Sequence, residues 1–133
     1  MAETFRVEIV SADCMVWEGD ALQITATTTE GEIGILARHI PLIATLAAGM
    51  AEVTTPDGNR IVAAVDGGFI AVTTDHTAII SPYARLAAGI NADEARRELE
   101  ELKVKLEAGD NSVSTKLAYN RALVQVKAAD RLT

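Results

Sequence analysis

The sequence has 133 residues, a length that fits one compact domain or one small domain with an appendage. Hydrophobic residues make up 49% of the chain and aromatic residues only 4%, so we expect a core of Val, Ile, Leu and Ala. The net charge of −7 argues against non-specific binding to nucleic acid, which requires clustered Lys and Arg.

The charge is unevenly distributed along the chain. Residues 1–89 contain 11 Asp or Glu against 4 Lys or Arg, whereas residues 90–133 contain 8 of each. The acidity therefore belongs to the N-terminal part. Simple solubility explains this acidity more readily than an acidic docking surface does.

Cys14 is the only cysteine, which excludes an intramolecular disulfide and fits a reducing compartment, and we expect its side chain to be buried. The first residues carry charges and lack the apolar region of a secretory signal, so we expect the protein to stay in the cytoplasm. The longest apolar stretch, Ile40 to Ala51, has 12 residues, whereas a transmembrane helix needs about 20. Membrane association is therefore expected only through a protein partner.

The N-terminal part has the pattern of short strands. Phe5, Val7 and Ile9 alternate with charged residues, which predicts a half-buried first strand. Segments rich in Val, Ile and Thr predict further strands at Ala21–Thr28, Met50–Thr55, Arg60–Val65, Gly68–Thr74 and His76–Ser81.

Turn residues separate these segments. Pro56-Asp57-Gly58-Asn59 is a strong hairpin turn, and Thr29–Glu32 and Asp66–Gly68 are two further candidates. Many short strands with turns at this spacing predict an all-β sandwich or barrel, which we assign to residues 1–86. The sequence does not give the strand order.

After Gly89 the apolar period becomes helical. Ala95, Leu99, Leu102 and Leu106 fall on one helix face, and Asn91 with Glu94 resembles a capping box at the start. Turn and cap residues at 108–112 precede a second helix, so residues 87–133 are predicted to form an antiparallel helical hairpin.

In the second helix an apolar stripe is formed by Val113, Leu117, Val124 and Ala128, with a weaker flank of Tyr119, Leu123 and Val126. Its basic residues are Lys116, Arg121, Lys127 and Arg131, against Asp130 alone. The small apolar residues would contribute only modest stabilisation on docking. Periodicity alone is compatible with a movable hairpin and equally with a rigidly packed one.

No catalytic site emerges from the sequence. His39 and His76 lie in no catalytic motif, and with one cysteine they do not make a zinc site. The glycines of Gly31–Ile35 and Asp66–Phe69 lack phosphate-loop spacing and are interpreted as turns. The acidic residues at 93–94 and 100–101 are expected on a solvent-facing helix surface.

Residues 31–49 place Glu32, Arg38 and His39 within an otherwise apolar run of small residues. Such a segment is a candidate protein contact, and it is equally compatible with a place in the core. The segment resembles the Gly-Glu-x-Gly-Ile, His-x-Pro-Leu and Leu-x-x-Gly pattern of ATP synthase epsilon subunits. Val10-Ser11-Ala12, Val65–Phe69 and the C-terminal hairpin follow in the same order as in that family.

The resemblance implies a β-sandwich followed by two helices that forms a non-catalytic part of the rotor stalk. Such a subunit binds gamma and the c ring, couples proton-driven c-ring rotation to ATP synthesis and inhibits ATP hydrolysis through its C-terminal helices. It is a peripheral protein on the cytoplasmic face of the bacterial cell membrane. No cofactor is implied.

The family motifs assign contacts to individual residues. Gly31 and Glu32 match the c-ring contact, although a plain turn residue in water is the alternative for Glu32. Ser11, Arg38 and His39 match positions toward gamma. The basic second helix is expected to contact the acidic catalytic head of alpha and beta subunits through Lys116, Arg121, Lys127 and Arg131.

Two departures from the family pattern stand out. Ala37-Arg38 replaces the usual Pro-Gly before His39, so the loop is expected to turn in another way. Some members bind ATP through Ile/Leu-Asp-x-x-Arg-Ala, but here Asn91 and Glu94 replace the Asp and the Arg. Without that Arg, and with a carboxylate in its place, ATP binding by the hairpin is doubtful.

The runner-up hypothesis is a free-standing β-sandwich that binds a small ligand and carries a helical cap. It predicts a stable monomer, whereas the first hypothesis predicts recovery of gamma in a pull-down. An enzyme is the third hypothesis.

Overall fold

A computed structural model describes residues 3–132 of the chain. Within this range there are nine strands, one short 3-10 helix and two α-helices. The strands are β1 Phe5–Ser11, β2 Met15–Ala21, β3 Gln23–Thr28, β4 Gly31–Leu36, β5 Leu42–Thr54, β6 Arg60–Asp66, β7 Phe69–Val72, β8 His76–Ser81 and β9 Ala84–Leu86. The 3-10 helix is Ala87–Gly89, and the α-helices are α1 Ala92–Glu107 and α2 Val113–Leu132.

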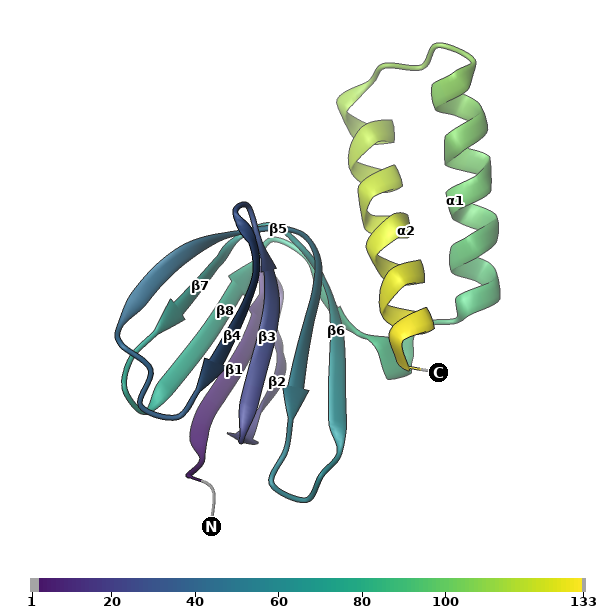
Figure 1. Ribbon diagram of the computed structural model, residues 1–133. Helices are drawn as coiled ribbons and strands as arrows, with labels where there is room; N and C mark the ends of the chain where they lie inside the picture. The colour runs from purple at the N-terminus through teal and green to yellow at the C-terminus, as the bar shows by residue number, and fades with distance from the viewer. Residues whose placement is uncertain (1–2, 133) are drawn as a thin grey trace.

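The strands form two packed sheets that share the long strand β5 (Figure 1). Sheet A has the order β2-β1-β8-β7-β5, and sheet B has the order β4-β3-β5-β6-β9. Leu42–Thr45 of β5 pair with β7 in sheet A, while Ala48–Thr54 pair with β6 in sheet B. The predicted fold class, a β-sandwich followed by an antiparallel helical hairpin, is therefore confirmed.

The sandwich core lies between the two sheets and consists mainly of aliphatic side chains. Phe5, Val7 and Ile9 are buried in β1, as their alternation predicts. Ile24 from sheet B and Ile79 from sheet A are also fully buried in this cluster. The turn after β6 needs glycine, because Gly68 has a φ of +96° and a Cβ would lie 2.1 Å from the Ile80 carbonyl oxygen.

Several strand predictions were incomplete. β2 and β9 were missed, and the segment Gly31–Ile35 is most of strand β4 and not a turn. β4 pairs with β3 along its whole length, and the turn lies just before it, at Thr29 and Glu30. β5 starts at Leu42, eight residues before the predicted strand, because its first part pairs with β7 of the other sheet.

The helical caps follow the sequence prediction. The Asn91 side chain accepts a hydrogen bond from the Glu94 N–H at 3.1 Å. The Ser112 side chain accepts one from the Thr115 N–H at 3.3 Å, and the Ser112 carbonyl accepts one from the Lys116 N–H. The two contacts accepted by side chains satisfy donors that the first helical turn leaves unpaired.

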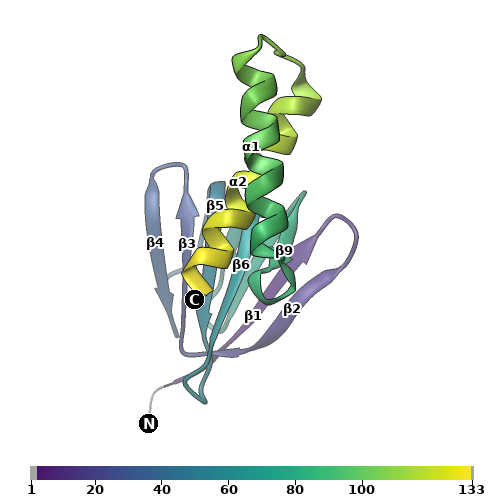
Figure 2. The same ribbon diagram turned by 90° about the vertical axis from the view of Figure 1, so that its right-hand side faces the viewer.

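The hairpin stands on the outer face of sheet B, and its tip projects beyond the sandwich (Figures 1 and 2). α2 lies against β5 and β6, and α1 packs on α2. Only the second half of the predicted apolar stripe is covered, because Val124 and Ala128 are buried whereas Val113 is 82% and Leu117 41% exposed. The apolar stripe of α2 therefore extends beyond the part of the helix that packs on sheet B.

The expectation for Cys14 is wrong. Its side chain is exposed at the turn between β1 and β2, where the chain reverses at the end of the sandwich.

Among residues 3–132, no helix combines the length and hydropathy needed to cross a bilayer.

Candidate functional site

The hairpin docks on sheet B through a small apolar cluster. Val62 and Ala64 of β6 form it with Ala87 and with Val124 and Ala128 of α2, and all five are buried. The partly buried side chains of Met50, Tyr83 and Ile90 border the cluster. Because most members are Ala or Val, the contact buries little apolar area for each residue, and its stabilisation is correspondingly modest.

Arg121 attaches the middle of α2 to the end of β6. Its Nε lies 3.5 Å from Asp66 Oδ2, and its guanidinium lies 5.0 Å from the centre of the Tyr83 ring. The Tyr83 hydroxyl accepts a hydrogen bond from the Gln125 amide. Arg121 Nε is nevertheless buried without a hydrogen bond to any of residues 3–132, since the approach to Asp66 lacks hydrogen-bond geometry. The docked position leaves this donor incompletely satisfied.

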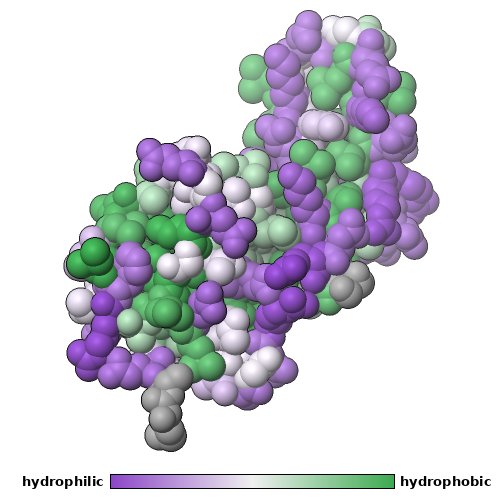
Figure 3. All heavy atoms as spheres, in the orientation of Figure 1, coloured by the Kyte–Doolittle hydropathy of each residue, from purple (hydrophilic) through white to green (hydrophobic). Residues whose placement is uncertain are grey.

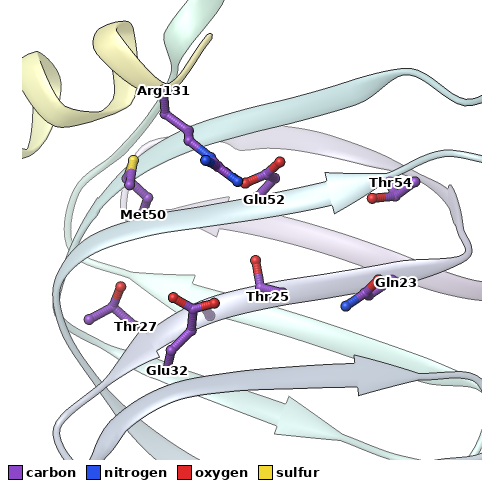
Figure 4. A pocket seen from close by; sticks show the side chains of 9 residues that line it. Gln23, Thr25, Thr27, Glu32, Met50, Glu52, Thr54 and Arg131 are labelled. Carbon is purple, nitrogen blue, oxygen red and sulfur yellow. The ribbon is translucent and has the colours of Figure 1, made fainter.

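Arg131 attaches the last turn of α2 to β5 and β6. Its Nε donates to Glu52 Oε2 at 2.9 Å, and Figure 4 shows the side chain pointing at Glu52. Arg60 Nη1 lies 3.3 Å from the other Glu52 oxygen. One carboxylate on β5 therefore joins an arginine from the sandwich to an arginine from the hairpin.

The four basic residues predicted to contact the catalytic head fall into two pairs. Arg121 and Arg131 face the sandwich and contact Asp66 and Glu52. Lys116 and Lys127 are exposed on α2. The docked hairpin thus presents its lysines to solvent and holds its arginines on sheet B.

Glu32 lies on the outer face of sheet B, opposite Thr27 of β3. It lines a polar groove of about 410 Å³ together with Gln23, Thr25, Thr27, Glu52, Thr54 and Arg131 (Figure 4). Gly31 precedes it at the start of β4 with a φ of +120°. Both residues therefore border the exposed β3–β4 turn, and Glu32 is a strand residue and not a turn residue.

The loop after β4 contains Arg38 and His39. Arg38 has a φ of +63°, so it adopts the left-handed conformation that glycine adopts more readily. The expectation that this loop turns in another way than the Pro-Gly of the family stays a prediction. The Arg38 N–H bonds the Thr74 carbonyl at 2.9 Å, and its side chain donates to Glu3 at 2.7 Å. The hydrogen bond and the charge of Glu3 raise the pKa of Arg38 above its ordinary value.

The structure does not bring Ser11 together with Arg38 and His39. Ser11 ends β1 and donates a hydrogen bond to the Cys14 carbonyl at 3.3 Å, whereas Arg38 contacts the β7–β8 turn. That turn lies at the other end of sheet A, because β1 and β8 run parallel and Arg6 pairs with His76. His39 donates through Nδ1 to the Ile40 carbonyl, 2.7 Å away.

The outer face of sheet A carries an apolar surface that the sequence analysis missed. Its exposed members are Ile43, Phe69, Ile80 and Met15. Phe69 pairs with Ile80, and Val10 links Ile80 to Met15 across β1. Figure 3 shows hydrophobic side chains gathered on the side of the sandwich where β7 lies. We call these four residues the sheet A face; Ser11 lies at one end of that sheet and the Arg38 loop at the other.

At the start of the hairpin, Glu94 occupies the position at which the ATP-binding motif of the family has an Arg. Asn91 and Glu94 together form the helix cap, and the nearby Arg96 pairs with Asp130 and lies 3.8 Å from Asp93. The expectation against ATP binding stays a prediction.

Among residues 3–132, no group of three His, Cys, Asp or Glu side chains could hold a metal ion.

Comparison with known proteins gives consistent matches. Residues 4–87 match the family described as ATP synthase, Delta/Epsilon chain, beta-sandwich domain. The ATP synthase epsilon chain of Cutibacterium acnes is 44% identical over 108 residues, which cover 80% of this chain and 74% of that one. The ATP synthase epsilon chain of Streptomyces griseus is 37% identical over 128 residues, which cover 96% of this chain and 97% of the other.

A solved structure shares the fold. A chain of the Euglena gracilis mitochondrial ATP synthase, determined with OSCP, F1 and the c ring, superimposes with a TM-score of 0.73. The two sequences are 23% identical, and the match covers 97% of this chain and 79% of that one. The likeness therefore includes the sandwich and the helical hairpin.

Proposed function

This chain belongs to the ATP synthase delta/epsilon chain family, and we propose that it is the epsilon subunit of a bacterial F-type ATP synthase. The observation that carries the proposal is the match to an epsilon chain over 96% of this chain and 97% of the relative, since it includes the hairpin. The chain is a non-catalytic subunit of the rotor stalk, and it is associated with the membrane through the complex. We place it on the cytoplasmic face of the cell membrane.

The sheet A face is the proposed binding surface for the gamma subunit. Ile43 and Phe69 are 77% and 53% exposed, and large apolar side chains of neighbouring strands rarely stay in water without a partner. Ser11, Arg38 and His39 flank this face at its two ends and are proposed to form its polar rim. Rim charges set the register of an interface more than they add affinity.

The exposed β3–β4 turn, with Gly31 and Glu32 at its border, is the proposed contact with the c ring. The proposed contact of the hairpin is the acidic catalytic head. In this proposal the hairpin undocks as a unit, residues 87–133, from the sandwich of residues 1–86. Its basic residues Lys116, Arg121, Lys127 and Arg131 then act as a brake on ATP hydrolysis.

A pull-down with the tagged chain tests the assembly proposal. Recovery of the gamma subunit is expected, and a lone protein would contradict it. Truncation after Gly89 tests the brake in the assembled enzyme, where faster ATP hydrolysis is expected. Unchanged hydrolysis would remove the inhibitory role and leave the assembly proposal intact.

The alternative of a small-ligand-binding module is not favoured. Aliphatic side chains from both sheets fill the interior of the sandwich. The polar groove beside Arg131 is open on the surface, and the matches above concern ATP synthase chains.

A further inference from the structure

Two largely buried carboxylates of sheet B receive the two arginines of α2. The Asp66 side chain is 12% exposed and contacts Arg121, and the Glu52 side chain is 16% exposed and contacts Arg131. Carboxylates this far from water interact with a cation more strongly than surface carboxylates do. Sheet B thus contains an acidic partner for each of the two arginines of α2.

The geometry of this surface is specific. Arg121 and Arg131 are ten residues apart in one helix, which corresponds to about 15 Å along the helix axis. The two carboxylates come from different strands, Asp66 from the end of β6 and Glu52 from near the end of β5. Lys116 and Lys127 are exposed, so the docked state leaves them accessible.

The two contacts differ in quality. Arg131 makes a 2.9 Å hydrogen bond to a carboxylate that Arg60 also contacts, so Glu52 keeps a cation when Arg131 leaves. Arg121 is held by an ion pair of 3.5 Å and by the Tyr83 ring, with Nε unsatisfied. A partner with better-placed carboxylates can therefore compensate Arg121 more fully than Asp66 does.

We propose that Asp66 and Glu52 are an internal substitute for the acidic partner of α2, and that they compete with this partner for Arg121 and Arg131. The partner is a protein surface with carboxylates about 15 Å apart that can lie along the same helix face. The inference rests on the proposed function, because it takes the acidic catalytic head as that partner. Hairpin docking then limits the brake by occupying its arginines.

Binding of poly-L-glutamate to the isolated full-length chain at low salt tests the competition. The double variant Glu52→Gln and Asp66→Asn keeps the side-chain shapes and removes both carboxylate charges. We expect it to bind the probe about tenfold more tightly than the natural chain, the change that corresponds to one lost charge-assisted hydrogen bond. Adding Arg121→Gln and Arg131→Gln should abolish the gain.

The control variant Asp13→Asn and Glu30→Gln removes the same charge from exposed sites in the β1–β2 and β3–β4 turns. An equal gain in the control, or no gain in the first variant, would overturn the proposal. Amide hydrogen exchange of β1 and β8 verifies that each sandwich stays folded. The gamma pull-down is independent of this measurement, so failure there would refute the proposed function and leave the competition standing.

Discussion

The guanidinium of Arg60 in β6 donates a hydrogen bond of 3.3 Å to the main-chain carbonyl of Arg131, 71 residues later in the chain. The last carbonyls of a helix have no partner within the helix, so a donor from the sandwich stabilises the end of α2. Glu52 completes the arrangement by contacting both side chains. The hairpin is thus held at the C-terminal end of α2, while its tip projects free of the sheet.

Replacing Ala128 with Asp should release the hairpin. Ala128 is 0% exposed and packs in the cluster with Val62 and Ala64, where an unpaired carboxylate is costly by several kcal/mol. The docking surface is small, so undocking is easier than unfolding the sandwich. Distances between spin labels at Ser114 and Thr29, in a Cys14→Ser background, should lengthen and broaden.

The matched control is Lys127→Asp, which introduces the same side chain at the neighbouring exposed position. Its label distances should stay those of the natural chain. Equal distances in the Ala128 and Lys127 variants would show that the apolar cluster does not hold the hairpin.

Removing the side chains of the sheet A face should weaken binding to gamma. Each large apolar side chain that becomes buried contributes about 1.5 kcal/mol or more, so Phe69→Thr and Ile43→Thr should each reduce the affinity about tenfold or more. Thr retains strand propensity, and the thermal unfolding temperature should change little. Calorimetric titration with gamma measures the affinity.

Leu36→Thr provides the comparison, because Leu36 is 59% exposed but lies at the end of β4 in sheet B. It should bind gamma as the natural chain does. A loss as large as that of Phe69→Thr would show that the sheet A face is not the specific surface.

The strand and helix patterns that depend on local periodicity were predictable. Phe5, Val7 and Ile9 alternate in β1, and the Asn91 cap opens α1 as its sequence indicates. β2 was not predictable in the same way, because Glu18, Gly19 and Asp20 give it little strand propensity. Its pairing with β1 comes from the hairpin turn and the ladder, which are properties of two segments together.

The candidate site required information from distant segments. Glu52 and Asp66 have no motif in common, and only the pairing of β5 with β6 puts them under α2. The sheet A face has the same origin, since Met15, Phe69 and Ile80 become neighbours through three different strand pairs. A sequence identifies such residues only after the strand order is known, which periodicity does not supply.

Replacing Thr77 with Val should stabilise the sandwich. Thr77 is 0% exposed in β8, and its hydroxyl makes no hydrogen bond to any of residues 3–132. Valine has nearly the same shape and removes the unpaired hydroxyl, so the free energy of unfolding should rise by about 1 kcal/mol. Urea denaturation measures the change.

Ser81→Ala is the matched control in the same strand. The Ser81 hydroxyl is used, since it donates to the Tyr83 carbonyl at 2.7 Å and accepts from the Tyr83 N–H at 3.3 Å. Its removal should lower the free energy of unfolding by about 1 kcal/mol. If Thr77→Val destabilised the protein as Ser81→Ala does, the Thr77 hydroxyl would have a partner in solution.

Replacing Arg38 with Gly should raise the thermal unfolding temperature by a few degrees. At a φ of +63° a side chain is strained and glycine is not, so the substitution removes strain from the loop. The lost contact with Glu3 joins two exposed side chains and contributes little in water. Arg38→Ala separates the two effects, because it loses the same ion pair and keeps the strained backbone. The alanine variant should therefore melt at or below the temperature of the natural chain, and equal melting of the glycine and alanine variants would contradict a strained Arg38.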